Sequence, residues 1–107
     1  MKAAKLIWES WESGHKIGTL PYNISPKSRK EAYEIQENLA YYSDMSVIGW
    51  KIAATSLEGQ KHIGVSGPLA GRILKDKVFQ PNDEIDFGNN KMAVAEPEFA
   101  FKIGKTL

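Results

Sequence analysis

The chain contains no cysteine, which excludes disulfide bridges, thiolate metal sites and cysteine nucleophiles. It also lacks an excess of charge of one sign, since fourteen Lys and Arg residues oppose thirteen Asp and Glu residues. Nucleic acids and anionic membranes are bound by concentrated basic fields, so neither partner is indicated. No apolar run approaches the length of a membrane span, and the charged N-terminus is unlike a secretory signal. These absences favour a soluble cytoplasmic protein.

The first part of the chain has the pattern of two helices. Over residues 2–13, apolar side chains recur at helical spacing, and Gly14 is expected to end this amphipathic helix. Residues 18–26 are rich in proline and other turn formers, which predicts a loop. Ser28 begins a capping box and so opens a second helix, which is expected to run to about Tyr42. A small helical layer should therefore come first in the fold.

The pattern changes to that of strands after the second helix. Residues 47–54 are β-branched and aromatic and predict a strand. Thr55 or Ser56 could then cap a short helix, and glycines make residues 64–71 a series of turns. The final run, residues 92–103, is the most strand-like of all.

Between these segments, residues 72–74 and 77–79 are weaker strand candidates. Helices followed by strands indicate an α+β fold. A long apolar strand close to the C-terminus, with few earlier strands to pair with, predicts an unfinished sheet. Because folded proteins cover such edges, we expect either a homo-oligomer or a C-terminal partner segment.

Two carboxylates form the sharpest chemical signal. In a strand, Glu96 and Glu98 point to the same face, about 6–7 Å apart along the chain. Buried like charges call for a hard cation, and oxygen ligands favour Mg²⁺ or Mn²⁺. Pro97 lacks an N–H group and so places the segment at an edge or rim of a sheet. The spacing alone fits either a metal site or two solvated glutamates.

Four other residues are candidates for a site. Lys51 lies within the strand at 47–54 and is either solvated or partly buried, and burial would depress its pKa and suit acid–base chemistry. Thr55 and Ser56 are either helix caps or substrate-binding hydroxyls. Arg72, after a glycine-rich turn, is either a surface arginine or a receiver of a substrate carboxylate.

Several motifs together resemble a known family. They include Gly-Trp-Lys at 49–51 and Glu-Pro-Glu at 96–98, supported by residues 20–21, Ser28, residues 32–36, 52–56, Gln60, residues 62–65, 67–72, 95 and 99–101. In this order the chain resembles the N-terminal part of the 2-keto-4-pentenoate hydratases, of the fumarylacetoacetate hydrolase superfamily. The resemblance covers nearly the whole chain.

The resemblance implies a fold and a reaction. It implies a helical cap region over residues 1–75, followed from residue 76 to 107 by the first strands of a mixed β-roll. Members of the family are hydro-lyases of aromatic catabolism that add water to 2-hydroxypenta-2,4-dienoate, giving 4-hydroxy-2-oxopentanoate. Glu96 and Glu98 would be two of three carboxylate ligands of Mg²⁺ or Mn²⁺, and Lys51 the active-site lysine, aiding proton transfer or binding the substrate oxygen.

The chain departs from the family in two respects. Leu69 stands where many members have an aspartate or another polar residue, which leaves the substrate and the proton route open. The family's third carboxylate lies beyond Glu98, and the chain has less than half the family length, so we expect these 107 residues to be truncated and inactive alone. The alternatives are a related 2-oxo-acid decarboxylase, a C–C hydrolase of the same superfamily, or a non-catalytic, partner-dependent chain.

Overall fold

The structure, a computed structural model, describes residues 2–88 and 92–105. Its elements, in chain order, are the helices and strands α1 (Lys2–Ser13), α2 (Arg29–Ser43), β1 (Val47–Ala53), α3 (Leu57–Ile63) and β2 (Leu69–Leu74), followed by one 3₁₀ turn, η1 (Lys75–Lys77). The prediction of an α+β fold with two helices ahead of the first strand is confirmed. None of the described helices is long and apolar enough to cross a membrane.

The two long helices begin and end where local sequence signals place them. Gly14, directly after α1, has a φ angle of 66°, in the left-handed region that glycine adopts without strain. At the start of α2, the Ser28 hydroxyl accepts a hydrogen bond of 3.2 Å from the backbone N–H of Glu31. The Glu31 carboxylate accepts from the backbone N–H of Lys27 at 2.7 Å, one residue earlier than in an ideal capping box. Asp44 ends α2 in the left-handed conformation.

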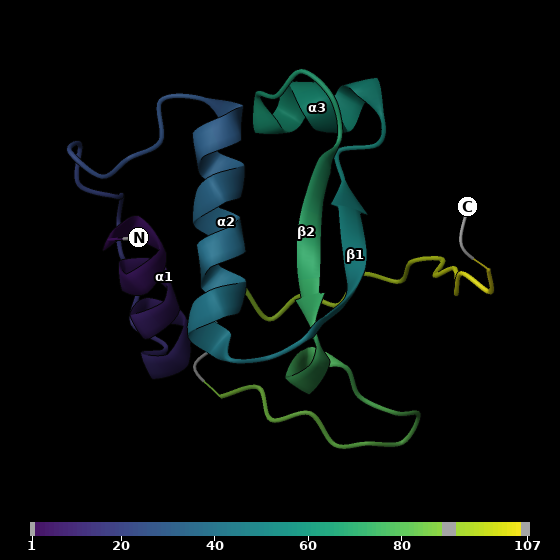
Figure 1. Ribbon diagram of the computed structural model, residues 1–107. Coiled ribbons are helices and arrows are strands. Elements are labelled where there is room, and N and C mark those ends of the chain that lie inside the picture. Colours follow the sequence, from purple (N-terminus) through teal and green to yellow (C-terminus); the bar gives the residue numbers. More distant parts are fainter. Residues whose placement is uncertain (1, 89–91, 106–107) are drawn as a thin grey trace.

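Strands β1 and β2 form a two-stranded antiparallel sheet, and α2 covers its β2 edge. The Tyr33 hydroxyl accepts a hydrogen bond from the backbone N–H of Ala70 at 3.0 Å, and the Gln36 amide donates to the Ala70 carbonyl at 3.0 Å. Two side chains thus satisfy edge groups that would otherwise be open to another strand. Figure 1 shows α1, α2, β2 and β1 side by side in that order, with β1 outermost.

The core of the described chain is small. Its buried apolar residues are Ala3, Ala4 and Leu74, and no large side chain among the described residues is fully buried. The two tryptophans of α1, Trp8 and Trp11, pack edge to face with their ring centroids 5.6 Å apart. The described residues therefore bury little apolar surface.

Three predictions of secondary structure differ from the structure. Residues 92–103 were expected to form a strand, but described residues 92–105 contain neither helix nor strand. A strand exists only through hydrogen bonds to a neighbour, and no described segment pairs with this one. Residues 77–79 are not a strand either, because η1 and an irregular stretch occupy this region. The turns expected over residues 64–71 give way to β2 from Leu69 onward.

The predicted incomplete domain agrees with the small sheet of the structure. The division into a cap region over residues 1–75 and a β-roll from residue 76 stays a prediction, as does the hydrolase-like roll itself.

Candidate functional site

Lys51 occupies the middle of β1 and lies opposite Gly71 of β2 in the sheet. The neighbouring pair, Trp50 and Arg72, projects from the other face, because successive side chains of a strand alternate. The two faces of the sheet therefore carry different chemistry. One bears the Lys51 ammonium, and the other bears the Arg72 guanidinium stacked on an indole ring, 5.0 Å from its centroid.

Glu96 and Glu98 converge on the Lys51 ammonium. The Nζ atom donates a hydrogen bond to Oε1 of Glu98 and lies 3.5 Å from Oε2 of Glu96. The side chains of Lys51 and Glu98 are 41% and 46% exposed, so solvent and small solutes reach the cluster. The irregular segment after residue 92 thus brings both carboxylates to β1, although it forms no strand there.

The carboxylates determine the charge of the lysine. The hydrogen bond to Glu98 is the main cause that raises the pKa of Lys51 above its usual value of 10.5, and the negative charges of Glu98 and Glu96 add to it. Partial desolvation acts in the opposite direction and is outweighed. A depressed pKa, the expected result of burial, is therefore not found. At neutral pH Lys51 carries its proton, so it can donate a hydrogen bond or a proton but cannot act as a base.

Whether these residues suit a metal ion can be judged from the two carboxylates that lie against the Lys51 ammonium. Glu96 and Glu98 already share a single positive charge, and carboxylate oxygens are ligands that Mg²⁺ and Mn²⁺ prefer. Within residues 2–88 and 92–105, no group of three or more His, Cys, Asp or Glu residues could hold a metal ion. The described residues therefore offer two carboxylate ligands that suit a hard cation.

Thr55 and Ser56, the candidate substrate-binding hydroxyls, lie beyond the end of β1. The Ser56 hydroxyl accepts a hydrogen bond of 3.0 Å from the backbone N–H of Gly59 and so caps α3. Thr55, directly before it, is exposed. Within the described part of the chain, neither hydroxyl forms a hydrogen bond with Lys51, and both remain only predicted substrate ligands.

Arg72 is held by α2 rather than by the Lys51 cluster. Its Nη1 donates a hydrogen bond of 3.0 Å to Oε1 of Gln36, and its Nη2 lies 4.0 Å from the Glu37 carboxylate. Its side chain is only 19% exposed. These contacts favour a structural role, joining helix and sheet, on the face opposite Lys51.

Two residues that the pattern did not single out shape the end of β1. Ala54 has a φ angle of 54°, a left-handed conformation that a non-glycine residue adopts at a cost. The Gln60 amide donates a hydrogen bond of 3.0 Å to the Ala54 carbonyl and so fastens α3 to this bend. No local signal could have identified the bend, because alanine is not typical of left-handed backbone.

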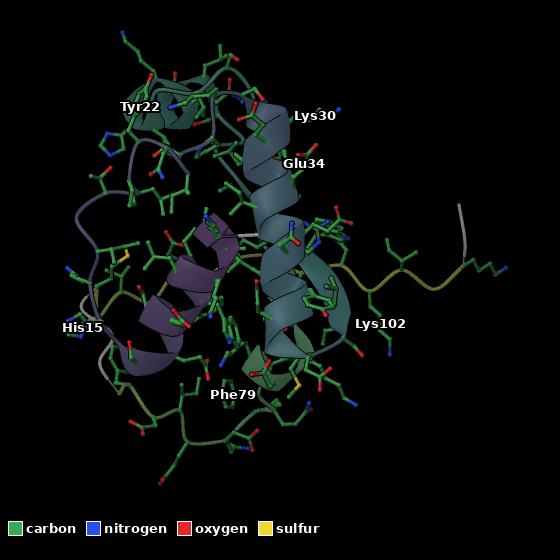
Figure 2. All side chains as sticks on the ribbon, turned by 60° about the vertical axis from the view of Figure 1, so that its left-hand side comes forward. His15, Tyr22, Lys30, Glu34, Phe79 and Lys102 are labelled. Carbon is green, nitrogen blue, oxygen red and sulfur yellow. The ribbon has the colours of Figure 1, made fainter. Side chains whose placement is uncertain are left out.

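A hollow among the described residues lies away from the Lys51 cluster. It has a volume of about 810 Å³ and lies between the end of α1 and the stretch after β2, where Trp11, His15, Lys77, Phe79 and Phe87 are among its lining residues. Figure 2 shows His15 and Phe79 at this lower end of the molecule. None of the candidate site residues lines this hollow, so it is not part of the candidate site.

The chain is similar in sequence to known proteins along nearly its whole length. The "TodF product hydratase" of Pseudomonas putida F1 is 30% identical over 109 residues, which cover 99% of this chain and 41% of that protein. The "2-keto-4-pentenoate hydratase" of Paraburkholderia xenovorans LB400 is 28% identical, over 99% of this chain and 40% of that protein. The chain matches the N-terminal part of 2-keto-4-pentenoate hydratases.

A third relative, "2-keto-4-pentenoate hydratase 3" of Pseudomonas putida, is also 28% identical over 99% of the chain. The chain spans about two-fifths of the length of these hydratases. Because the match takes in nearly the whole chain, β1 and the segment carrying Glu96 and Glu98 both lie in the hydratase-like region. No family model matches the sequence, and no solved structure matches it.

Proposed function

We propose that this chain supplies the N-terminal part of a metal-dependent hydratase, which adds water to 2-hydroxypenta-2,4-dienoate to give 4-hydroxy-2-oxopentanoate. The convergence of Glu96 and Glu98 on one cation, the Lys51 ammonium, carries the proposal. Three relatives, each named a hydratase, support the reaction class.

Glu96 and Glu98 are the residues that would hold Mg²⁺ or Mn²⁺. When bound, such a cation would supply Lewis-acid stabilisation for the carboxylate and 2-oxygen of the substrate. The two glutamates come from a segment without regular structure, and both lie against the Lys51 ammonium of β1. Their task is therefore to fix the cation beside the strand that carries Lys51.

Lys51 is the candidate for binding the substrate oxygen and for donating a proton. The ordinary pKa of a lysine, 10.5, already keeps the ammonium charged at neutral pH, so it can donate a hydrogen bond to an oxygen on which negative charge develops. Such a group lowers the energy of an enolate-like state more than that of the neutral substrate. Lys51 is thus proposed as a donor and not as the group that removes a proton.

A chimeric enzyme tests the proposal directly. These 107 residues would replace the matched N-terminal part of the Pseudomonas putida F1 hydratase, and hydration of 2-hydroxypenta-2,4-dienoate would be followed with added Mg²⁺ or Mn²⁺. We expect turnover that depends on the cation. Glu98→Gln should abolish the cation-dependent turnover, and Lys51→Ala should lower kcat by about 10²–10⁴-fold, the usual size of proton-transfer catalysis.

The matched controls are Lys30→Ala and Glu34→Gln, which alter an exposed Lys–Glu pair on α2 with a separation of 4.0 Å. Figure 2 shows Lys30 and Glu34 on α2, away from Lys102 and the terminal segment. Both controls should leave turnover unchanged. A folded chimera whose turnover survives Glu96→Gln, Glu98→Gln and Lys51→Ala would rule out the proposed roles.

A further inference from the structure

Gly71 lies in the interior of β2, directly opposite Lys51 of the adjacent strand β1 (Figure 1). Opposite residues of an antiparallel pair point their side chains to the same face of the sheet, with Cβ atoms about 4.5–5.5 Å apart. A side chain at position 71 would therefore stand beside the stem of Lys51, on the face where Glu96 and Glu98 contact its ammonium. Glycine leaves that position without a side chain.

The backbone does not require glycine at position 71. Gly64 and Gly67, earlier in the chain, have φ angles of 79° and 119°, which glycine adopts far more readily than other residues, whereas the φ angle of Gly71 lies outside this range. The irregularity in the register of the two strands lies between Val47 and Gly49. Neither a left-handed conformation nor a β-bulge therefore accounts for Gly71.

Packing within the described chain does not require it either. A Cβ atom added at Gly71 would lie 3.8 Å from the Lys51 carbonyl oxygen, an ordinary contact, and no other described atom beyond its chain neighbours would lie within 4 Å. Gly49, on the same face of β1, is different, because its Cβ would meet Cδ1 of Ile73 at 3.6 Å. The Ile73 side chain thus occupies the space over Gly49, whereas no described group occupies the space over Gly71.

A glycine within a strand weakens the strand and often marks the close approach of a ligand or of another backbone. The surroundings of Gly71 favour a ligand. Leu69 and Ile73 lie two residues away on either side and share its face, and Lys51 stands opposite. A crossing backbone would need partners for its N–H and C=O groups, which these two apolar side chains do not offer. A small acid with an apolar carbon chain matches both the charged and the apolar neighbours.

We propose that Gly71 is a specificity-determining position, over which the carbon chain of the substrate lies while its acid end is bound at the Lys51 cluster. The inference rests on the proposed function, because it takes the Lys51 cluster as the place where the carboxylate and 2-oxygen bind. It adds the character of the other end of the substrate, which is apolar and lies between Leu69 and Ile73. The size of residue 71 then limits how long that end can be.

The chimeric hydratase tests this with two substrates. Gly71→Ala and Gly71→Val would be compared on 2-hydroxypenta-2,4-dienoate and on 2-hydroxyhexa-2,4-dienoate, which is one carbon longer. We expect KM to rise with the size of the side chain, by at least about tenfold for valine, because added bulk fills the space of the substrate. The kcat at saturation should stay within about twofold. For the longer substrate, kcat/KM of Gly71→Val should fall at least about tenfold further.

Stability provides the readout that a merely structural role would move in the other direction. Valine is favoured in strands and meets open space at position 71, so Gly71→Val should leave the urea midpoint of the 107-residue chain unchanged or raise it. The chimera should behave in the same way. The matched control is Gly18→Val, at a loop glycine where an added Cβ has no described atom within 4 Å. This control should leave KM unchanged for both substrates.

Three results would overturn the role of Gly71. The first is an unchanged KM in Gly71→Val. The second is a loss of stability in the Gly71→Val chimera with equal losses of kcat/KM for both substrates, which would show that another part of the polypeptide approaches the glycine. The third is an equal rise of KM in Gly18→Val.

Binding of 2-oxopentanoate, measured by calorimetry on the chimera with Mn²⁺, separates this inference from the proposed function because it needs no turnover. A chimera without hydratase activity that binds 2-oxopentanoate, and binds it at least about tenfold more weakly as Gly71→Val, contradicts the function and keeps the role of Gly71. An active chimera whose KM and binding ignore residue 71 contradicts the role and keeps the function. A folded chimera that neither binds nor turns over contradicts both.

Discussion

Lys51 and Glu98, which lie 47 positions apart in the chain, form a hydrogen-bonded ion pair between β1 and the terminal segment. Glu96 lies 3.5 Å from the same ammonium. One lysine thus neutralises part of the charge of both carboxylates proposed to bind a cation. A metal ion and the ammonium would therefore compete for the same oxygen atoms.

Replacing the lysine should strengthen cation binding by the isolated chain. In Lys51→Met the carboxylates lose a positive charge a few ångströms away, and we expect Mn²⁺ to bind several-fold more tightly at low ionic strength. Glu98→Gln should weaken binding. Calorimetric titration of Mn²⁺ measures both, with Lys30→Met as the control on α2. An unchanged affinity in Lys51→Met would show that the ammonium and the cation do not share a site.

The pH dependence of the pair follows from the direction of the pKa shift. The pKa of Lys51 is raised above 10.5 by its hydrogen bond to Glu98. The contribution of the charged lysine to stability is therefore fully present below pH 10.5 and is lost as the pH rises through the raised pKa. Carbon-detected NMR of the Lys51 Cε atom should show this late titration. In Glu98→Gln the midpoint should move down, and an unmoved midpoint would contradict the assigned cause.

The helices and β1 could be predicted because their signals are local. Helical spacing up to Gly14, the cap at Ser28 and the β-branched and aromatic residues 47–54 each act within one element. The structure has the two helices and a strand there, and the strand ends one residue earlier than predicted, at Ala53. Residues 92–103 also carry a local strand pattern, but a strand needs a partner that lies elsewhere. The prediction there was wrong for the described structure because pairing is a long-range property.

The candidate site was predictable only in its parts. The spacing of Glu96 and Glu98 indicates two carboxylates that act together, but nothing in the spacing connects them with a lysine far earlier in the chain. Likewise, no pattern shows that Arg72 faces α2, because its face depends on the register between β1 and β2. Local pattern made Lys51 one candidate among several, and only the resemblance to the hydratases assigned it to the same site as the two glutamates.

The hydrogen bonds from α2 to the edge of β2 should contribute measurably to stability. Tyr33→Phe removes the hydroxyl that accepts from the Ala70 N–H, and we expect the free energy of unfolding to fall by about 1 kcal/mol. Tyr22→Phe is the matched control, because its ring is exposed and its contact with the Lys27 ammonium needs only the π face. Urea titration compares the two. Equal losses in both variants would show that the Ala70 hydrogen bond contributes nothing specific.

Two substitutions of Ser56 distinguish a role in capping α3 from a role in binding substrate. Its hydroxyl caps α3, so Ser56→Ala should lower the free energy of unfolding by about 0.5–1 kcal/mol, while Ser56→Asp, another good cap, should retain it. In the chimeric hydratase, the KM of Ser56→Asp should equal that of the parent. A stable Ser56→Asp chimera with a strongly raised KM would instead make Ser56 a substrate ligand.

The 107 residues alone should show no hydration of 2-hydroxypenta-2,4-dienoate, even with millimolar Mg²⁺ or Mn²⁺. Only two carboxylates converge in the described structure, and a cation held by two such ligands and water is bound weakly. The Lys51 cluster is also about half exposed, so water screens the charges that would have to stabilise an enolate. Ultraviolet absorbance of the dienoate, followed with the purified chain, measures any turnover. Turnover that disappears in Glu96→Ala would show that two glutamates and Lys51 suffice for catalysis, and that the chain needs no further ligand.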